Sequence, residues 1–201
     1  MGSVTKADID RLVDGTTVAR EFVDTVARCG DSTALRWMQL DGTLGSVSFA
    51  EFGDRAARAA AGLRSLGVQP GDRVALLMPN APELVFALLG CAWLGAVAVP
   101  IGVRAGADET AHTLADAGAV ALVCDGSRLA TLPPAEALPA LRHRIAFGTQ
   151  APAGAGTFAA LMAAAPLAQP HAAAEEDLAV LLYTSGTTGY PKGSMVTQLN
   201  I

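Results

Sequence analysis

The sequence is poor in lysine, cysteine and aromatic residues, and each shortage argues against a class of protein. Of 201 residues only two are lysine and three are cysteine, 5% are aromatic, and the formal net charge is −5. With so few basic residues the chain has no basic stripe, which argues against a nucleic-acid-binding module. Because 51% of the residues are apolar and only 16% are charged, the chain is not a disordered tail either. We therefore expect a folded domain.

The three cysteines, Cys29, Cys91 and Cys124, lie far apart among small or apolar neighbours. An odd number without CxxC spacing predicts neither a disulfide framework nor a metal site, so we expect three buried, reduced thiols. The first fifteen residues contain no apolar segment of the kind found in a signal peptide. Both features predict a cytoplasmic protein.

A run of twenty uncharged residues, 84–103, is long enough to span a bilayer. However, three glycines and Pro100 interrupt this run. The pattern favours a helix over about 81–94, with Asn80 as its N-cap, followed by a strand over about 96–100. We therefore predict a buried helix and strand and no membrane span, and a membrane helix is the less favoured alternative.

Helical and strand patterns alternate along the chain, which predicts an α/β fold with a largely parallel sheet flanked by helices. Ser48 and Glu51 have the spacing of a capping box at the start of one long helix. Residues 126–177 have many breakers and few β-branched residues, which predicts surface helix and loop. We expect helices over 16–28, 50–67, 81–94 and 107–117, and strands over 33–40, 46–49, 73–79, 96–100, 119–125, 143–147 and 178–183.

The last predicted strand leads into a loop made only of hydroxyl residues and glycine, with a lysine close behind. These residues are Thr184, Ser185, Gly186, Thr187, Thr188 and Gly189, followed by Lys192. Glycines allow successive backbone N–H groups to approach an anion, hydroxyls add donors, and the lysine adds a positive charge. Such a loop is suited to the phosphates of a nucleoside triphosphate.

Other interpretations of this loop fit less well. The Walker pattern needs a second glycine where this chain has Pro191, which disfavours a P-loop NTPase. The GxGxxG pattern is missing from the loop. A surface linker rich in serine, threonine and glycine does not usually follow a buried strand, and here it would contain one of only two lysines.

Residues 183–200, YTSGTTGYPKGSMVTQLN, resemble the phosphate-binding signature of adenylate-forming enzymes, [YF]TSGTTGxPKGxxxTHxN. This superfamily includes acyl-CoA synthetases, luciferase-like ligases and the adenylation domains of peptide synthetases. All fixed positions from Tyr183 to Gly193 match. Residues 46–101 resemble the early region of fatty-acyl-CoA ligases, and residues 106–125 resemble the next region of those ligases, so the resemblance extends from about Gly15 onward.

The resemblance implies an ATP-dependent ligase of a carboxylic acid, expected to be a fatty acid. The acid attacks the α-phosphorus of ATP, and CoA then takes the acyl group from the acyl-adenylate. It implies ATP, Mg²⁺ and CoA as cofactors or co-substrates. Thr184, Ser185, Thr187 and Thr188 would donate hydrogen bonds to the phosphates, Gly186 and Gly189 would permit the tight backbone path, and Lys192 would pair with the β- and γ-phosphates.

Gln198 departs from the family pattern, which usually has histidine there. Because that histidine typically lies near the acyl pocket, the resemblance does not predict how this chain binds the acid, whereas it does predict phosphate binding. Gln198 can donate and accept hydrogen bonds but does not titrate near neutral pH. We interpret His112, His143 and His171 as surface residues away from any candidate partner.

The resemblance also predicts how the chain is organised: residues 1–14 as an N-terminal extension and 15–201 as part of the N-terminal AMP-binding domain. Segments for adenine, Mg²⁺ and the mobile C-terminal domain are expected after Ile201, so no catalytic residue or metal ligand is expected within this chain. We predict that the chain alone lacks ligase activity. We also expect an unpaired sheet edge and uncovered apolar faces to make the chain poorly stable or to make it self-associate, with Ala- and Leu-rich faces as the pairing surface. The alternative is a catalytically silent nucleotide-binding or interaction module with the same fold.

Overall fold

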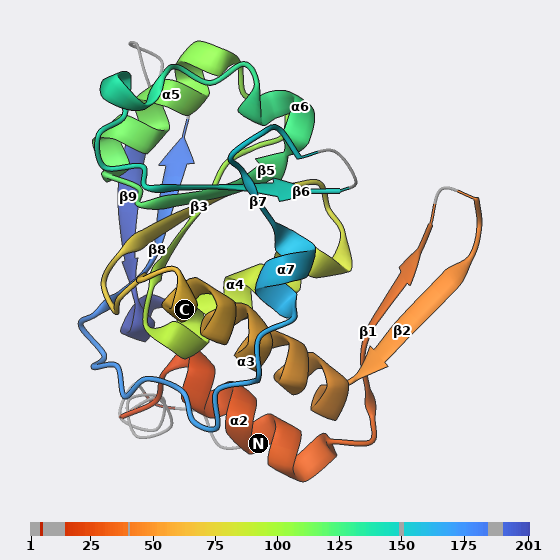
Figure 1. Cartoon of the computed structure of the whole chain (residues 1–201). Coiled ribbons are helices and arrows are strands. Elements are labelled where there is room, and N and C mark those ends of the chain that lie inside the picture. The colour runs from red at the N-terminus through yellow and green to blue at the C-terminus, as the bar shows by residue number, and fades with distance from the viewer. Residues whose placement is uncertain (1–4, 6–14, 40, 149–150, 185–190) are drawn as a thin grey trace.

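The computed structural model describes residues 5, 15–39, 41–148, 151–184 and 191–201. Helices and strands alternate along this part of the chain, as predicted (Figure 1). The helices are α2 (Val18–Cys29), α3 (Phe49–Ser65), α4 (Pro82–Leu94), α5 (Ala107–Ala117), α6 (Gly126–Leu129) and α7 (Phe158–Met162), with 3₁₀ turns η1 (Ala135–Ala137) and η2 (Gln198–Asn200). The strands are β1 (Thr33–Met38), β2 (Leu44–Ser48), β3 (Arg73–Leu77), β4 (Val97–Pro100), β5 (Ala121–Asp125), β6 (His143–Phe147), β7 (Gly156–Thr157), β8 (Leu178–Thr184) and β9 (Lys192–Thr197).

Seven of the strands form one sheet in the order β7-β6-β5-β3-β4-β8-β9. Every neighbouring pair is parallel except β8 and β9, which are antiparallel. Helices α2, α3, α4 and α7 lie on one side of this sheet and α5 and α6 on the other (Figure 1). The predicted α/β fold with a largely parallel, helix-flanked sheet is therefore confirmed.

The central strand β3 is buried on both faces because helices cover the sheet on both sides. Val74 and Leu76 belong to the core under α3 and α4, whereas Ala75 and Leu77 belong to the core under α5. This alternation explains why the segment is a continuous apolar run. The sheet thus separates two hydrophobic cores.

Small residues let α3 and α4 approach each other closely. A Cβ atom added at Gly90 on α4 would lie 2.6 Å from the Cβ of Ala59 on α3. Helix α7 approaches α3 in the same way, because a Cβ atom added at Gly62 would lie 2.3 Å from the carbonyl oxygen of Leu161. Neither position has room for a side chain, so the glycines in these helices serve packing. The many alanines of this region have the same effect along the rest of α3, where Ala56, Ala57, Ala59, Ala60 and Ala61 are buried.

The apolar run 84–103 is divided between α4 and β4, as predicted, and Gly95 ends the helix with a φ of 78°. The prediction of Asn80 as N-cap is wrong, because Ala81 holds that position and Pro82 begins the helix. Proline favours the first helical position and keeps the residue before it extended, so it moves the start by one residue. Among the described residues, no helix has both the length and the apolar character needed to cross a membrane.

The cysteines differ in burial. Cys91 and Cys124 are buried, and burial raises the pKa of each thiol to about 12, with the charge of Asp125 contributing at Cys124. Cys29 lies at the end of α2 and is only half-buried, so the prediction of three buried thiols is wrong for this residue. A residue at the end of a surface helix is partly exposed to water, and the neighbours of Cys29 in the sequence did not reveal this exposure.

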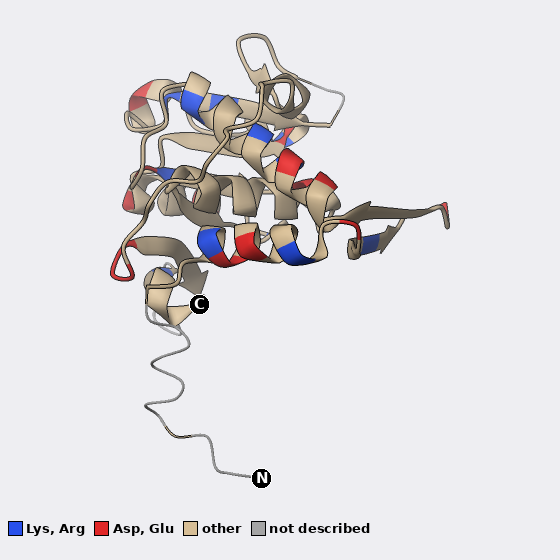
Figure 2. Cartoon of the chain, turned by 90° about the horizontal axis from the view of Figure 1, so that it is seen from below, with Lys and Arg blue, Asp and Glu red and all other residues tan. Residues whose placement is uncertain are grey.

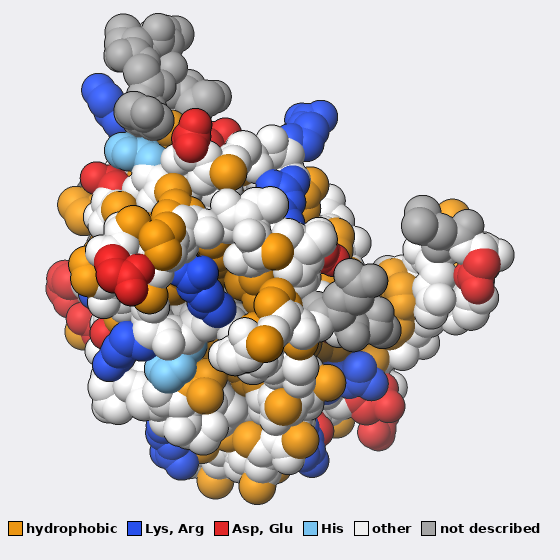
Figure 3. Space-filling view, turned by 45° about the horizontal axis from the view of Figure 1, so that its top comes forward, with side chains coloured by type: hydrophobic (Ala, Val, Ile, Leu, Met, Phe, Trp, Pro, Cys, Tyr) orange, Lys and Arg blue, Asp and Glu red, His pale blue; other side chains and the backbone are white. Residues whose placement is uncertain are grey.

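The remaining features are a projecting hairpin and a surface on which charged and apolar residues are interspersed. Strands β1 and β2 pair antiparallel and project from the body as a two-stranded arm (Figures 1 and 2). Acidic and basic residues alternate along the helices seen in Figure 2 rather than gathering by sign. The space-filling view also shows apolar, acidic and basic side chains interspersed over the top of the molecule (Figure 3). These two views show no large patch of one charge.

The capping box at the start of α3 is confirmed and gives a first testable prediction. The Glu51 amide donates to Ser48 Oγ at 3.2 Å, and the Ser48 amide donates to Glu51 Oε2 at 2.8 Å. Replacing Ser48 with alanine removes the first bond, so we expect the free energy of unfolding to fall by about 1 kcal/mol in urea denaturation. The control is Ser32→Ala at an exposed position, and an equal effect of both variants would contradict the role of the cap.

Candidate functional site

The predicted phosphate loop connects β8 to β9, and the structure describes both ends of this connection. Thr184, the last residue of β8, pairs with Lys192, the first residue of β9, and Tyr183 pairs with Gly193. Both Thr184 and Lys192 are exposed. The other predicted phosphate-binding residues, Ser185, Gly186, Thr187, Thr188 and Gly189, lie outside the described residues.

Strand β9 is a feature that the sequence did not predict. Its residues KGSMVT pair along the whole of β8, so β9 and not β8 forms this edge of the sheet. The expectation of an unpaired edge at β8 is therefore wrong. Among the described residues, the unpaired edge at this end of the sheet is instead that of β9, where Met195 is 69% exposed, so self-association through the sheet edge stays a prediction for β9.

The hairpin extends beyond the strand that supports it. Strand β4 pairs with β8 at Ala98 and Val180 and ends two residues later at Pro100. Proline has no N–H group, so it cannot donate a further hydrogen bond toward β8. The end of the hairpin that carries the loop, including Tyr183, therefore lies past the backbone pairing with the rest of the sheet.

Side chains from α5 contact this free end of the hairpin. Tyr183 Oη donates to Asp116 Oδ2 at 2.6 Å, and His112 Nε2 lies 3.2 Å from the carbonyl oxygen of Pro191, so it can donate when the proton is on Nε2. Burial raises the pKa of Tyr183 above its ordinary value, as do the hydrogen bond to Asp116 and its charge, so the phenol stays protonated and donates. The prediction that His112 lies away from any candidate partner is wrong. The pairing of Asp116 with Tyr183 was not predicted, because residues so distant in sequence give no local pattern.

Gln198 lies at the opposite end of β9 from Lys192. It is 7% exposed, and its Oε1 accepts a hydrogen bond of 3.1 Å from the amide of Val18 at the start of α2. The backbone N–H of Gln198 donates to the carbonyl oxygen of Asp177 at 2.9 Å. In this structure Gln198 therefore stabilises the start of a helix and is separated from the loop by a whole strand.

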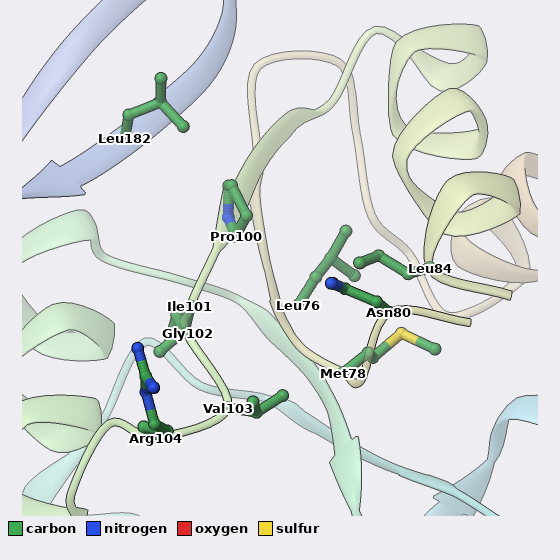
Figure 4. Close-up of a pocket in the computed structure, with 10 residues that line it drawn as sticks. All are labelled: Leu76, Met78, Asn80, Leu84, Pro100, Ile101, Gly102, Val103, Arg104 and Leu182. Carbon is green, nitrogen blue, oxygen red and sulfur yellow. The ribbon is translucent and has the colours of Figure 1, made fainter. Parts of the chain in front are cut away.

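A cavity of about 530 Å³ lies at the carboxyl ends of β3 and β4 (Figure 4). The connection after β3 continues into α4 on one face of the sheet, and the connection after β4 continues into α5 on the other. Ligands of open α/β sheets bind in the crevice that forms where neighbouring connections diverge in this way. The lining residues are Leu76, Met78, Asn80, Leu84, Pro100, Ile101, Gly102, Val103, Arg104 and Leu182.

The cavity and the phosphate loop are neighbours, because Leu182 lines the cavity and lies two residues before the end of β8. The wall is mainly apolar, and Arg104 supplies its positive charge. Such a lining accommodates the organic part of a ligand with a polar or anionic group at one end. Among the described residues, no three His, Cys, Asp or Glu side chains lie together as a group that could hold a metal ion.

Comparison with protein families and known proteins agrees with this geometry. Residues 22–201 match the family described as AMP-binding enzyme. A feruloyl-CoA synthase from Amycolatopsis sp. is 40% identical over 156 residues, which are 78% of this chain and 29% of that protein. A crotonobetaine/carnitine–CoA ligase from Salmonella paratyphi A is 34% identical over 197 residues, which are 94% of this chain and 38% of that protein.

Among solved structures, an anthranilate CoA ligase in complex with anthranoyl-AMP superposes with a TM-score of 0.81 and 26% sequence identity. The match covers 91% of this chain and 35% of that one. This chain thus spans about a third of the length of the proteins it matches. The similarity therefore covers the fold and the loop region but only part of each whole protein.

Proposed function

Because this chain belongs to the family of AMP-binding enzymes, we propose that it carries the phosphate-binding part of an ATP-dependent carboxylic acid–CoA ligase. Such an enzyme joins the acid to AMP, releases pyrophosphate and transfers the acyl group to CoA. One observation carries the proposal: the β8–β9 hairpin sets Thr184 opposite Lys192 at the two ends of the glycine- and hydroxyl-rich connection. This hairpin stands beside a cavity at the carboxyl end of a parallel sheet.

We propose that the loop binds the triphosphate through neutral donors and one cation. Hydroxyl groups and backbone N–H groups donate to phosphate oxygens without adding charge, and Lys192 balances negative charge that builds on the phosphates during the reaction. The proposed binding residues are Thr184, Ser185, Gly186, Thr187, Thr188, Gly189 and Lys192. ATP is the nucleotide, Mg²⁺ would neutralise its phosphates when bound, and CoA is the proposed acceptor.

For the carboxylic acid substrate we propose only a chemical class. The early-region resemblance to fatty-acyl-CoA ligases supports a fatty acid. The two relatives compared above are named for ferulate and for crotonobetaine or carnitine, which are different kinds of acid. A panel with a fatty acid, an aromatic acid and a short polar acid therefore tests the substrate class.

We further propose that the 201-residue chain binds the nucleotide but does not complete ligation by itself. Supporting this, the chain spans only 29% to 38% of the two relatives' lengths. Pyrophosphate release that depends on a carboxylic acid, measured on the purified chain, would contradict this part of the proposal. Nucleotide binding by a longer protein that also shows no acid-dependent turnover would favour a catalytically silent binding module.

The small number of lysines allows a direct test of nucleotide binding. Lys192 is exposed, and Lys6 is the only other lysine in the chain. An amine-reactive reagent should modify both lysines, and peptide mapping then measures the labelling of each. With Mg·ATP at about ten times its Kd, occupancy should slow the labelling of Lys192 about tenfold. Labelling of Lys6 serves as the internal control and should not change. Equal rates at Lys192 with and without nucleotide would contradict the proposed site.

A further inference from the structure

We propose that helix α5 positions the phosphate loop, with Asp116 and His112 as positioning residues for nucleotide binding. This inference rests on the proposed function, because it assigns a task to residues that hold the two ends of that loop. Asp116 contacts Tyr183 on the strand before the loop, and His112 contacts the Pro191 carbonyl just before the strand after it. A single helix therefore contacts both ends of the connection.

The two contacts come from one face of the helix. His112 and Asp116 are four residues apart, so their side chains lie one above the other along α5. The residues that face the sheet are Thr110, Thr113, Leu114 and Ala117, and all four are buried. The helix therefore cannot rotate to release the hairpin without exposing its buried face.

Arginine side chains anchor α5 at both ends. Arg73 at the start of β3 donates from Nε to the carbonyl of Ala117 at 2.7 Å and from Nη2 to that of Gly118 at 3.0 Å. Arg128 on α6 donates from Nη1 to the carbonyl of Ala105 at 2.6 Å, just before the helix. Hydrogen bonds from charged donors are stronger than those between neutral groups. The helix is thus a fixed support, which is what a positioning element needs.

Tyr183 also joins the two strands of the hairpin to each other. A Cβ atom added at Gly193 would lie 3.0 Å from Cζ of the Tyr183 ring, so the ring lies directly over the β9 backbone. From that position its hydroxyl group reaches Asp116. Fixing the ring therefore fixes Gly193 and its neighbour Lys192 on the same strand.

The charge of Asp116 excludes direct binding of phosphate. A carboxylate accepts hydrogen bonds but donates none when ionised, and it repels an anion. Asp116 would therefore weaken nucleotide binding if it faced the phosphates alone. Because it accepts the Tyr183 hydroxyl instead, its effect on the nucleotide acts through the position of the hairpin.

The test measures the Kd of Mg·ATP by calorimetry for the protein and for Tyr183→Phe, Asp116→Ala and the double variant. Loss of one hydrogen bond near a charge should weaken binding about three- to tenfold. The double variant should be no weaker than Asp116→Ala, because both changes remove the same bond. Asp116→Asn keeps an oxygen acceptor and should stay within about twofold of the unmodified protein. Asp108→Ala, a loss of the same charge on the first turn of α5, is the matched control and should leave the Kd unchanged.

A second measurement separates positioning from general stability. Hydrogen exchange at the amides of residues 192–194 should be faster in Tyr183→Phe, whereas exchange in β3 and β5 should be unchanged. Global unfolding would speed exchange everywhere and would overturn a positioning role. Unchanged nucleotide affinity in Tyr183→Phe and Asp116→Ala would also overturn it, even where Lys192→Ala loses binding and the proposed function stands. If the unmodified protein binds no Mg·ATP at all, the proposed function fails first and this inference fails with it.

Discussion

Replacing Phe86 with alanine is expected to lower the free energy of unfolding by about 3–5 kcal/mol. Phe86 is 1% exposed and is the largest of the fully buried side chains among the described residues. Its ring packs edge-on against Phe52 with centroids 5.4 Å apart, and the guanidinium carbon of Arg55 lies 5.1 Å from its centroid. Because domains of this size are stable by only about 5–15 kcal/mol, the variant should lose a large part of its stability.

Two other substitutions calibrate this result. Phe86→Leu keeps most of the apolar volume and should cost clearly less than Phe86→Ala. Met38→Ala removes an apolar side chain that is 71% exposed on the projecting hairpin, so it should change stability by no more than about 0.5 kcal/mol. Urea denaturation of the three variants gives the comparison. Equal effects of Phe86→Ala and Met38→Ala on stability would contradict the burial of Phe86 between α4 and α3.

Local signals in the sequence predicted most of the fold. Strand β3 is a continuous apolar run because helices cover both of its faces, and the chain on either side contains turn residues. The long helix α3 begins directly after its N-cap Ser48, because the capping box is complete within four residues. In both cases the physical cause lies within a short stretch of chain, so a single sequence reveals it.

The rest of the fold depends on contacts that no local pattern contains. Strand β9 begins with lysine, glycine and serine, which are poor strand formers, and it exists because β8 offers it a complete set of partners. The bond between Tyr183 and Asp116 joins residues 67 positions apart. His112 was interpreted as a surface residue for the same reason, since its contact with Pro191 arises only when α5 packs beside the hairpin.

Of the candidate site, the loop was recognisable from its composition, whereas its support was not. Glycine and hydroxyl residues predict phosphate binding by their types alone. The position of Lys192 is different, because the sequence placed it in the loop and the structure places it in a strand. A lysine on a paired strand starts from a fixed backbone position, so only its side chain loses freedom when it contacts an anion.

Replacing Lys192 with alanine is therefore expected to weaken Mg·ATP binding about 10- to 150-fold. This range corresponds to the loss of one hydrogen bond between charged groups, about 1.5–3 kcal/mol. Lys192 is exposed, so the free energy of unfolding should change by less than about 0.5 kcal/mol. Calorimetric titration and urea denaturation of the same preparations measure both quantities.

The variants Lys192→Arg and Lys6→Ala separate charge from position. Arginine keeps the positive charge but presents a planar fork in place of a compact ammonium group, so an intermediate loss of affinity is expected. Lys6→Ala removes the same charge elsewhere in the chain and should leave the affinity unchanged. If both alanine variants weakened binding equally, the nucleotide would respond to net charge alone. Lys192 pairs with Thr184 across the hairpin. A loss of affinity in Lys192→Ala alone would therefore place the phosphates at the loop end of the β8–β9 hairpin, where Asp116 of α5 contacts Tyr183.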